Sequence, residues 1–269
     1  MNILNIEHIS KIYGEKVIFD DVSLGIHSGD KIGVIGVNGT GKTTLLKIIA
    51  KINEPDKGQI ICGNGIRVSY LPQNPEFPKK QSILEYVMDG KEHQDWKTES
   101  EAKTILTKLG IYDFDEGCDH LSGGQKKRVA LARTLVDPTE VLILDEPTAV
   151  LTPQETEKLF RVLRKMRDDG KAIVIITHKM HEVKSLSDRV AVLRGGRYIG
   201  SLVTKDTDVN TMTDMMVGHA VTLNIERPEP VNPKPRIEVE GLTVRNEEGI
   251  VKLKDVSFTA NSGEILGIA

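Results

Sequence analysis

The stretch GVNGTGKT, residues 36–43, limits the possible folds of this chain more than any other stretch, because it joins an apolar run to an amphipathic one. The run Lys31–Ile35 predicts a buried strand and the segment Lys42–Ala50 predicts a helix. Glycines between them let the backbone turn back with its N–H groups pointing inward, and they leave room for a phosphate close to the main chain. The helix that follows adds the positive end of its dipole. We therefore predict a phosphate site.

Within this loop, Lys42 is placed to reach the β- and γ-phosphates of a nucleotide, and the Thr43 hydroxyl to ligate Mg²⁺. A glycine-rich turn that binds nothing is the alternative for the motif taken alone. The loop residues expected to contact the nucleotide are Gly36, Asn38, Gly39, Thr40, Gly41, Lys42, Thr43 and Thr44.

Composition narrows the class of protein. The chain has 269 residues, of which 39% are hydrophobic, so we expect one full domain and a remainder. Its net charge is −3, with basic clusters no longer than Lys126–Arg128, which argues against direct DNA binding. Cys62 and Cys118 lack metal-ligand spacing and are too few for a disulfide framework, as in a reducing cytosol. The sequence contains no 18-residue apolar run, so we expect any work at a membrane to use a separate subunit.

The N-terminal region is predicted to form two antiparallel strands. Leu4–Ile9 and Val17–Ile26 are rich in β-branched residues, and the turn lies near Tyr13 and Gly14. Tyr13 precedes the phosphate loop by a little over twenty residues, where an aromatic ring can stack on an adenine. The alternative is a tyrosine at a strand end that packs on its neighbours.

Gln73 follows two short predicted strands, Gln59–Cys62 and Arg67–Leu71. A glutamine that leaves a strand near the nucleotide can ligate Mg²⁺ or orient the attacking water; without the surrounding motifs it would be an ordinary loop residue. Ser82–Gly90 and Thr98–Gly110 are then predicted helices without phosphate chemistry, which suits either a partner surface or a structural insert.

The motif LSGGQ, Leu121–Gln125, opens another predicted helix and again presents N–H groups at a helix N-terminus. One chain with one phosphate loop has no obvious need for a second anion site. We therefore expect Ser122, Gly123, Gly124 and Gln125 to cover the γ-phosphate of a nucleotide held by another domain, facing head to tail. A plain helix cap is the alternative.

Two further strands are predicted to end in catalytic side chains. The run VLILDEP, residues 141–147, is a buried strand with carboxylates at its C-terminal edge. Asp145 would hold Mg²⁺ through water, and Glu146 would accept a proton from the attacking water. His178 follows the apolar run Ala172–Thr177 and would contact the γ-phosphate and keep Glu146 and the water in line. Solvated turns and a structural histidine are the alternatives.

The C-terminal part repeats the beginning of the chain. Residues 219–235 contain four prolines and predict a short linker. After it, KDVSFTANSGEILGIA matches DDVSLGIHSGDKIGVI, which places Ala269 opposite Ile35. We expect a first domain at 1–218, the linker at 219–235, and at 236–269 the first strands of a truncated second domain.

With these motifs in order, the first 218 residues resemble an ATP-binding cassette (ABC) domain. The resemblance implies an α/β fold of the P-loop NTPase class, with a mostly parallel core sheet, flanking helices, an antiparallel β subdomain and a small helical subdomain. It implies ATP and Mg²⁺ as cofactors, a second cassette as partner, from a homodimer or from the missing part of the chain, and hydrolysis in a sandwich dimer. Among the family's motifs, Tyr13 matches the residue that stacks on adenine, residues 36–43 match the loop that binds the phosphates and Mg²⁺, and Gln73 matches the coupling glutamine. Residues 122–125 match the signature that acts in trans. Asp145 and Glu146 match the metal-binding and base carboxylates, and His178 matches the switch histidine.

The two halves resemble different branches of that family. GDKIGVIGVNGTGKTTLLKIIA, YLPQNPEF and LSGGQKKRVALA are similar to ABC-F proteins, which are soluble ATPases acting on ribosomes. From Pro147 onward, PTAVLTPQE, THKMHEV and SDRVAVLRGGRYIGS are similar to the tandem ATPase subunit of importers for simple sugars or nucleosides, which share Thr152 in place of the family's usual aspartate. The second resemblance implies a cytoplasmic subunit held at the inner face of the cell membrane by permeases. The alternatives are a ribosome-associated factor and a non-functional fragment.

Overall fold

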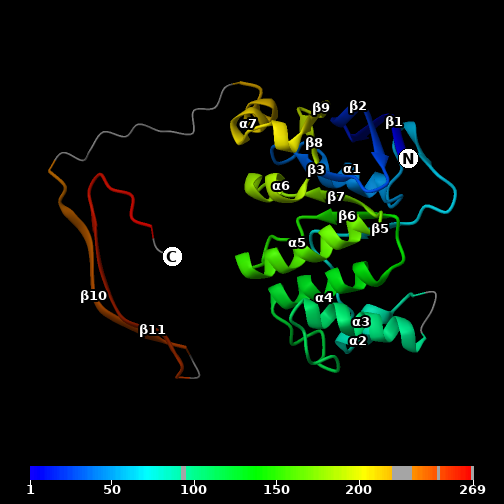
Figure 1. Cartoon of the computed structure of the whole chain (residues 1–269). Helices are drawn as coiled ribbons and strands as arrows, with labels where there is room; N and C mark the ends of the chain where they lie inside the picture. Colours follow the sequence, from blue (N-terminus) through cyan, green and yellow to red (C-terminus); the bar gives the residue numbers. More distant parts are fainter. Residues whose placement is uncertain (92–94, 220–231, 247–248, 268–269) are drawn as a thin grey trace. The chain divides into compact units, whose positions relative to one another are not determined.

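The computed structural model describes residues 1–91, 95–219, 232–246 and 249–267, and it divides the chain into two units, 1–221 and 222–269 (Figure 1). The first unit holds every motif discussed above apart from the repeat. In the part of the chain that the structure describes, no helix has the length and apolar character needed to cross a membrane.

A six-stranded sheet forms the centre of the first unit, in the order β5-β6-β7-β3-β8-β9. All neighbours are parallel except β8 and β9, so the α/β class with a mostly parallel core sheet is confirmed. All five residues of β3, β6 and β7 are buried, which explains why their sequences are apolar without alternation. The strands are β3 Lys31–Ile35, β5 Val68–Leu71, β6 Val141–Asp145, β7 Ala172–Ile176, β8 Arg189–Arg194 and β9 Arg197–Val203.

Each central strand serves two hydrophobic cores, because successive side chains point to opposite faces of the sheet. In β6, Leu142 and Leu144 join the core shared with α2–α5, while Val141 and Ile143 join the core shared with α1 and the N-terminal strands. The helices are α1 Lys42–Ile49, α2 Ile83–Met88, α3 Trp96–Lys108, α4 Gly123–Val136, α5 Pro153–Asp168, α6 Met180–Leu186 and α7 Val209–Val217, with a 3-10 turn at Thr204–Asp206.

A second sheet of the first unit has three antiparallel strands in the order β2-β1-β4. In the sequence, β1 and β2 precede the phosphate loop and β4 follows it. The sheet contains β1 Asn2–Tyr13, β2 Lys16–His27 and β4 Lys57–Cys62. The predicted antiparallel pair of N-terminal strands is thereby confirmed, with its turn after Tyr13.

The helices α2, α3 and α4 form a small helical group that packs around Ala102, Leu106 and Val129. The sequence predicted α3 from Thr98, but the helix begins at Trp96 because the Asp95 side chain accepts a hydrogen bond from the Thr98 N–H at 2.9 Å.

The second unit is a hairpin of β10 Pro235–Arg245 and β11 Val251–Asn261. It reproduces an irregularity of the β1–β2 hairpin: the Ser23 hydroxyl accepts from the His8 N–H at 2.9 Å, and the Ser257 hydroxyl accepts from the Gly241 N–H at the same distance. Asp21 and its counterpart in the repeat, Asp255, both have φ 54°. The repeat in the sequence is therefore also a repeat in backbone shape.

The repeat stops short of a third strand in the described residues. Residues 265–267 form no strand, whereas their counterparts Lys31–Gly33 belong to β3, which pairs with β7 and β8. Leu266 is 44% exposed, and its counterpart Ile32 is fully buried. The physical reason is that the described part of this unit has no equivalents of β7 and β8. The predicted boundaries at 218 and 235 stay predictions, since linker residues 220–231 lie outside the described residues.

Candidate nucleotide-binding site

The phosphate loop connects the buried end of β3 to α1, and two of its glycines are required by close contacts. At Gly41, φ is +89°, and a Cβ there would lie 2.6 Å from Ile18 Cγ2. At Gly36, a Cβ would lie 2.5 Å from the Leu193 carbonyl oxygen. Gly39 also has a positive φ, of +82°, but a Cβ there would meet open space. The loop therefore packs its glycines against β2 and β8 and leaves its middle accessible.

The side chains of the loop are held by its own carbonyl groups. The Lys42 ammonium donates hydrogen bonds to the carbonyls of Gly36, at 2.7 Å, and Val37, at 3.0 Å. The Thr40 hydroxyl is buried and donates to Val37 at 2.9 Å, so its contact is structural. Burial lowers the pKa of Lys42, while the nearby Glu146 and Asp145 carboxylates oppose that shift.

A cleft of about 650 Å³ lies beside the loop. It brings together nine of the predicted site residues, which come from the phosphate loop and from the ends of three other segments. Those nine are Asn38, Gly39, Gly41, Lys42, Thr43, Thr44, Gln73, Glu146 and His178, and the other lining residues are Lys16, Ile18 and Ile176. Because parallel strands present their carboxyl ends at one edge of the sheet, β3, β6 and β7 bring their motifs to this one place.

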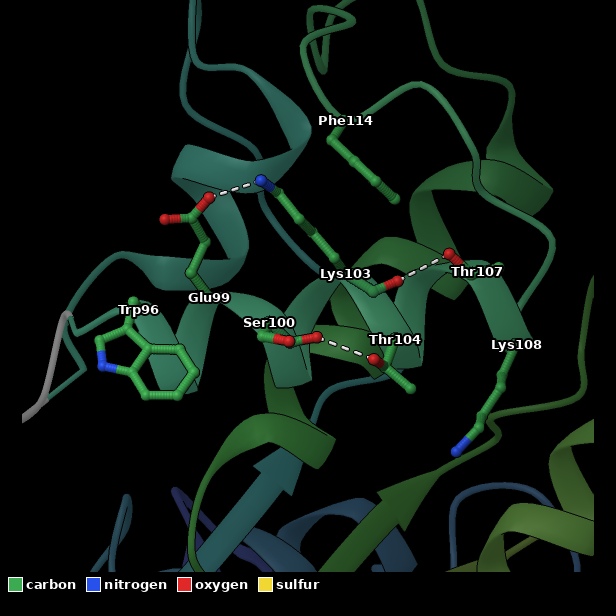
Figure 2. Close-up of a pocket in the computed structure, with 8 residues that line it drawn as sticks. All are labelled: Trp96, Glu99, Ser100, Lys103, Thr104, Thr107, Lys108 and Phe114. Carbon is green, nitrogen blue, oxygen red and sulfur yellow. Dashed lines mark hydrogen bonds and ion pairs between the residues drawn. The ribbon is translucent and has the colours of Figure 1, made fainter.

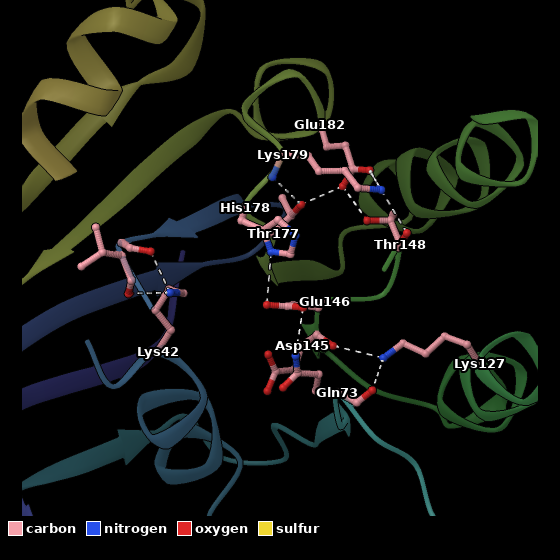
Figure 3. A network of polar contacts seen from close by, with 12 residues as sticks. Lys42, Gln73, Lys127, Asp145, Glu146, Thr148, Thr177, His178, Lys179 and Glu182 are labelled. Atoms are coloured by element: carbon pink, nitrogen blue, oxygen red, sulfur yellow. Dashed lines mark hydrogen bonds and ion pairs between the residues drawn. The ribbon is translucent and has the colours of Figure 1, made fainter. Parts of the chain in front are cut away.

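Glu146 is the meeting point of these segments (Figure 3). Its Oε2 accepts a hydrogen bond from Gln73 Nε2 at 3.0 Å, and its Oε1 lies 3.3 Å from His178 Nδ1. Glu146 has φ 50°, a left-handed conformation that is strained for a residue with a Cβ and costs about 1–3 kcal/mol. Its N–H donates to the Ile176 carbonyl at 3.0 Å, which holds the start of the loop after β6 against the end of β7.

Asp145 precedes Glu146 but has a different environment. It is 1% exposed, and its Oδ2 accepts a hydrogen bond from the Tyr70 hydroxyl at 3.1 Å. Burial raises the pKa of Asp145, while hydrogen bonds from Thr43 and Tyr70 oppose that shift. The predicted metal ligands Thr43 and Asp145 therefore lie near each other.

Two groups of side chains around the site were not assigned from the sequence. Glu182 is 2% exposed and accepts hydrogen bonds from Thr148, at 2.6 Å, and Thr177, at 2.8 Å, so it links the loops after β6 and β7 (Figure 3). Lys127 belongs to the basic cluster Lys126–Arg128 of the sequence, but it is only 4% exposed. Its signal in the sequence was its place in a predicted helix close to the apolar Val129.

Tyr13 lies at the end of β1 and is not among the residues that line the cleft. The residue is 48% exposed, the Lys11 ammonium lies 5.5 Å from the centroid of its ring, and its hydroxyl accepts a hydrogen bond from Asn53 at 3.2 Å. Its strand partner, Lys16, does line the cleft. Stacking of Tyr13 on adenine stays a prediction.

The signature residues 122–125 lie outside the cleft. Ser122 caps α4: its hydroxyl accepts from the Gln125 N–H at 3.3 Å, and the Gln125 side chain accepts from the Ser122 N–H at 2.9 Å. Ser122 and Gly123 are exposed. The cap explains the local structure, and action on a nucleotide of another domain stays a prediction.

A second hollow, of about 640 Å³, lies along α3 between Trp96 and Phe114 (Figure 2). Several of its polar side chains form bonds within α3: Lys103 bonds to Glu99 at 2.5 Å, and Thr104 donates to the Ser100 carbonyl at 2.8 Å. It lacks the inward-facing N–H groups and glycines of the phosphate loop. The nucleotide is therefore expected in the first cleft.

Comparison with known proteins bears on the fold and the family of the first unit. The sequence model of the family described as ABC transporter matches residues 19–149. A crystal structure of the ADP conformation of an ATP-binding cassette of an ABC transporter superimposes with a TM-score of 0.68 and 26% identity, over 80% of this chain and 96% of that one. The matched region of the first unit therefore belongs to the ATP-binding cassette family.

Two relatives with different names are similar to this chain. The ribose import ATP-binding protein RbsA of Caldanaerobacter subterraneus is 32% identical over 99% of this chain and 57% of its own length. The ABC transporter ATP-binding protein YfmR of Bacillus subtilis is 33% identical over 73% of this chain and 37% of its own length. This chain thus spans about half the length of the ribose import relatives it matches.

Proposed function

We propose that this chain binds ATP with Mg²⁺ and hydrolyses it, and that it powers the import of a simple sugar or a nucleoside through permease subunits. The observation that carries the chemical part is the convergence of Gln73 and His178 on the Glu146 carboxylate, in the cleft that Lys42 also lines. The relatives named as ribose import ATP-binding proteins support the transport part.

Each side chain of the cleft has a separate task in this proposal. Lys42 and the N–H groups of the loop bind the phosphates. Glu146 accepts the proton of the attacking water, and its two hydrogen bonds orient the carboxylate for that task. His178 contacts the γ-phosphate, and Gln73 senses the same site from the loop after β5.

The donors near Asp145 fit a magnesium ion. The Thr43 hydroxyl, the Gln73 amide oxygen and the Asp145 carboxylate are hard oxygen ligands of the kind that Mg²⁺ prefers. Thr43 is near enough to Asp145 to influence its pKa, so two of the three donors lie in the same region. A bound metal would neutralise charge that develops on the phosphoryl oxygens.

Hydrolysis in this proposal requires a second cassette, from a second copy or from a further domain. Ser122–Gln125 lies outside the cleft of its own domain, and its N–H groups are placed at an exposed helix start. It would cover the γ-phosphate held by the other cassette, while Tyr13 stacks on the adenine. We place the protein in the cytoplasm, at the inner face of the membrane through its permeases.

The test is steady-state ATP hydrolysis by the purified chain at increasing protein concentration, with Lys42→Ala as the blank. A rate per molecule that rises with concentration supports hydrolysis by paired cassettes. A rate at the blank level throughout, with ATP bound, contradicts hydrolysis by this chain. Glu146→Gln should bind ATP and lose about 10²–10⁴ in rate, because proton abstraction is lost.

The transport part needs its own measurement. Uptake of labelled ribose is measured in cells that lack their ribose import ATP-binding protein and express either this chain or the Lys42→Ala variant. Uptake restored by the parent chain alone supports sugar import. Sedimentation of the chain with ribosomes, dependent on ATP and without restored uptake, would instead favour the ABC-F alternative predicted from residues before Pro147.

A further inference from the structure

The Lys127 ammonium lies at the junction of three segments of the first unit (Figure 3). It donates hydrogen bonds to the carbonyls of Gln73 at 2.7 Å, Pro72 at 3.2 Å and Asp145 at 3.3 Å. Lys127 itself comes from the first half of α4, two residues after Gln125. One side chain therefore joins the signature helix to the loop after β5 and to the end of β6.

The three hydrogen bonds use all the donors of the Lys127 ammonium. A lysine ammonium has three donors and no acceptor, and three backbone carbonyls face it. Burial lowers the pKa of Lys127, and the nearby Asp145 and Glu146 carboxylates oppose that shift. A hydrophobic side chain at this place would leave the carbonyls without their donor, so the position is suited to a tether and not to packing alone.

Gln73 is held at both of its ends by this arrangement. Its carbonyl accepts from Lys127, and its side-chain amide donates to Glu146 at 3.0 Å. The Asp145 carbonyl, held by the same ammonium, belongs to the peptide bond that leads into Glu146. Lys127 thus fixes the backbone on both sides of the Gln73–Glu146 hydrogen bond.

We propose that Lys127 is a positioning residue for hydrolysis, which holds Gln73 against Glu146 and links their placement to the helix that carries Ser122. The inference rests on the proposed function of the cleft. Because Lys127 stands five residues after Ser122, about 7–8 Å along the helix at 1.5 Å per residue, a displacement of the helix start also displaces the ammonium. The signature and the proposed base are then coupled through one side chain.

The test compares Lys127→Met with a matched control, Lys91→Met. Lys91 is also a buried ammonium bound to α4: it donates to the Arg133 carbonyl at 2.7 Å and to Asp137 at 2.5 Å, and it does not line the nucleotide cleft. Both variants lose a buried cation. Lys127→Met alone should lower kcat for ATP, by about 100-fold for a displacement near 1 Å, with KM within twofold of the parent value.

A double-variant cycle separates positioning from general damage. If Lys127 acts through Gln73, then Lys127→Met combined with Gln73→Ala should be no slower than Gln73→Ala alone. Losses that multiply, or equal losses in Lys127→Met and Lys91→Met, would overturn the proposal. Should Lys127→Met fail to fold, Lys127→Gln keeps an amide donor and should show a smaller loss with the same non-additivity.

A readout without hydrolysis distinguishes this inference from the proposed function. Amide hydrogen exchange in residues 71–77 should be faster in Lys127→Met than in the parent chain and unchanged in Lys91→Met. Unchanged exchange in both variants would refute the tether. A parent chain that hydrolyses no ATP would refute the proposed function, while the exchange experiment would still decide whether Lys127 holds the loop.

Discussion

Replacing Gly41 by alanine should destabilise the first unit more than the same change at Gly39. Both glycines have left-handed φ values, +89° and +82°, so each alanine carries a backbone cost of about 1–2 kcal/mol. Only at Gly41 does the new Cβ also meet atoms, at 2.6 Å from Ile18 Cγ2 and 3.0 Å from Phe19 Cδ1. Phe19 is fully buried, so the clash adds about 1–3 kcal/mol of overpacking.

The expected loss in free energy of unfolding is therefore about 1–2 kcal/mol for Gly39→Ala and about 2–5 kcal/mol for Gly41→Ala. Urea unfolding, followed by circular dichroism at a helical wavelength, measures this difference in the first unit, because all helices of the described residues lie there. Equal losses in the two variants would refute the argument from the contact with β2. The measurement needs no nucleotide, so it tests the loop geometry independently of the proposed function.

Three other predictions concern the cap, the buried carboxyl and the repeat. Ser122→Ala and its control Ser82→Ala each remove a capping box with the same 3.3 Å hydrogen bond, and each should lower the free energy of unfolding by about 1 kcal/mol. Only Ser122→Ala should lower the ATPase rate. Equal ATPase rates in the two variants would contradict a signature role for Ser122. Burial raises the pKa of Asp145 above 3.8, so the folded state binds this proton more tightly and stability falls as pH rises through the folded pKa. Asp145→Asn should thus stabilise the chain near pH 7, and urea titrations should show that this gain disappears as pH falls towards 3.8; a gain that does not depend on pH would refute this account. Deletion of residues 236–269 should leave the melting temperature of the first unit unchanged, because that segment belongs to a separate unit, and a sharp fall in calorimetry would show that it supports the core.

Much of the fold could be predicted from the sequence, because the deciding patterns are local. The apolar runs of β3, β6 and β7, the Pro153 start of α5 and the glycine loop each lie within a few consecutive residues. The start of α3 was placed two residues late because the Asp95 cap precedes the apolar pattern. Residues 265–267, which repeat the start of β3 in sequence, form no strand because a parallel strand needs neighbours that local sequence does not supply.

The candidate site could also be predicted from the sequence only in part. The types and spacing of Lys42, Gln73, Glu146 and His178 were enough to predict them as site residues, and all four line one cleft in the fold. The left-handed backbone of Glu146 and its hydrogen bond from Gln73 had no signal in the sequence, since they depend on the neighbouring strand and on a distant loop.

By itself, the sequence determined the phosphate loop, the order of the motifs and the family, since glycine conformation and strand and helix patterns act over short distances. Only the tertiary structure decided the partners and burial of the charged side chains. Lys127 stands in the basic cluster Lys126–Arg128 of the sequence, yet it is buried against carbonyls 54 and 55 residues away in the chain. The physical reason is that desolvation and hydrogen bonding depend on which distant segments meet, and these are fixed only when the sheet and its helices have packed.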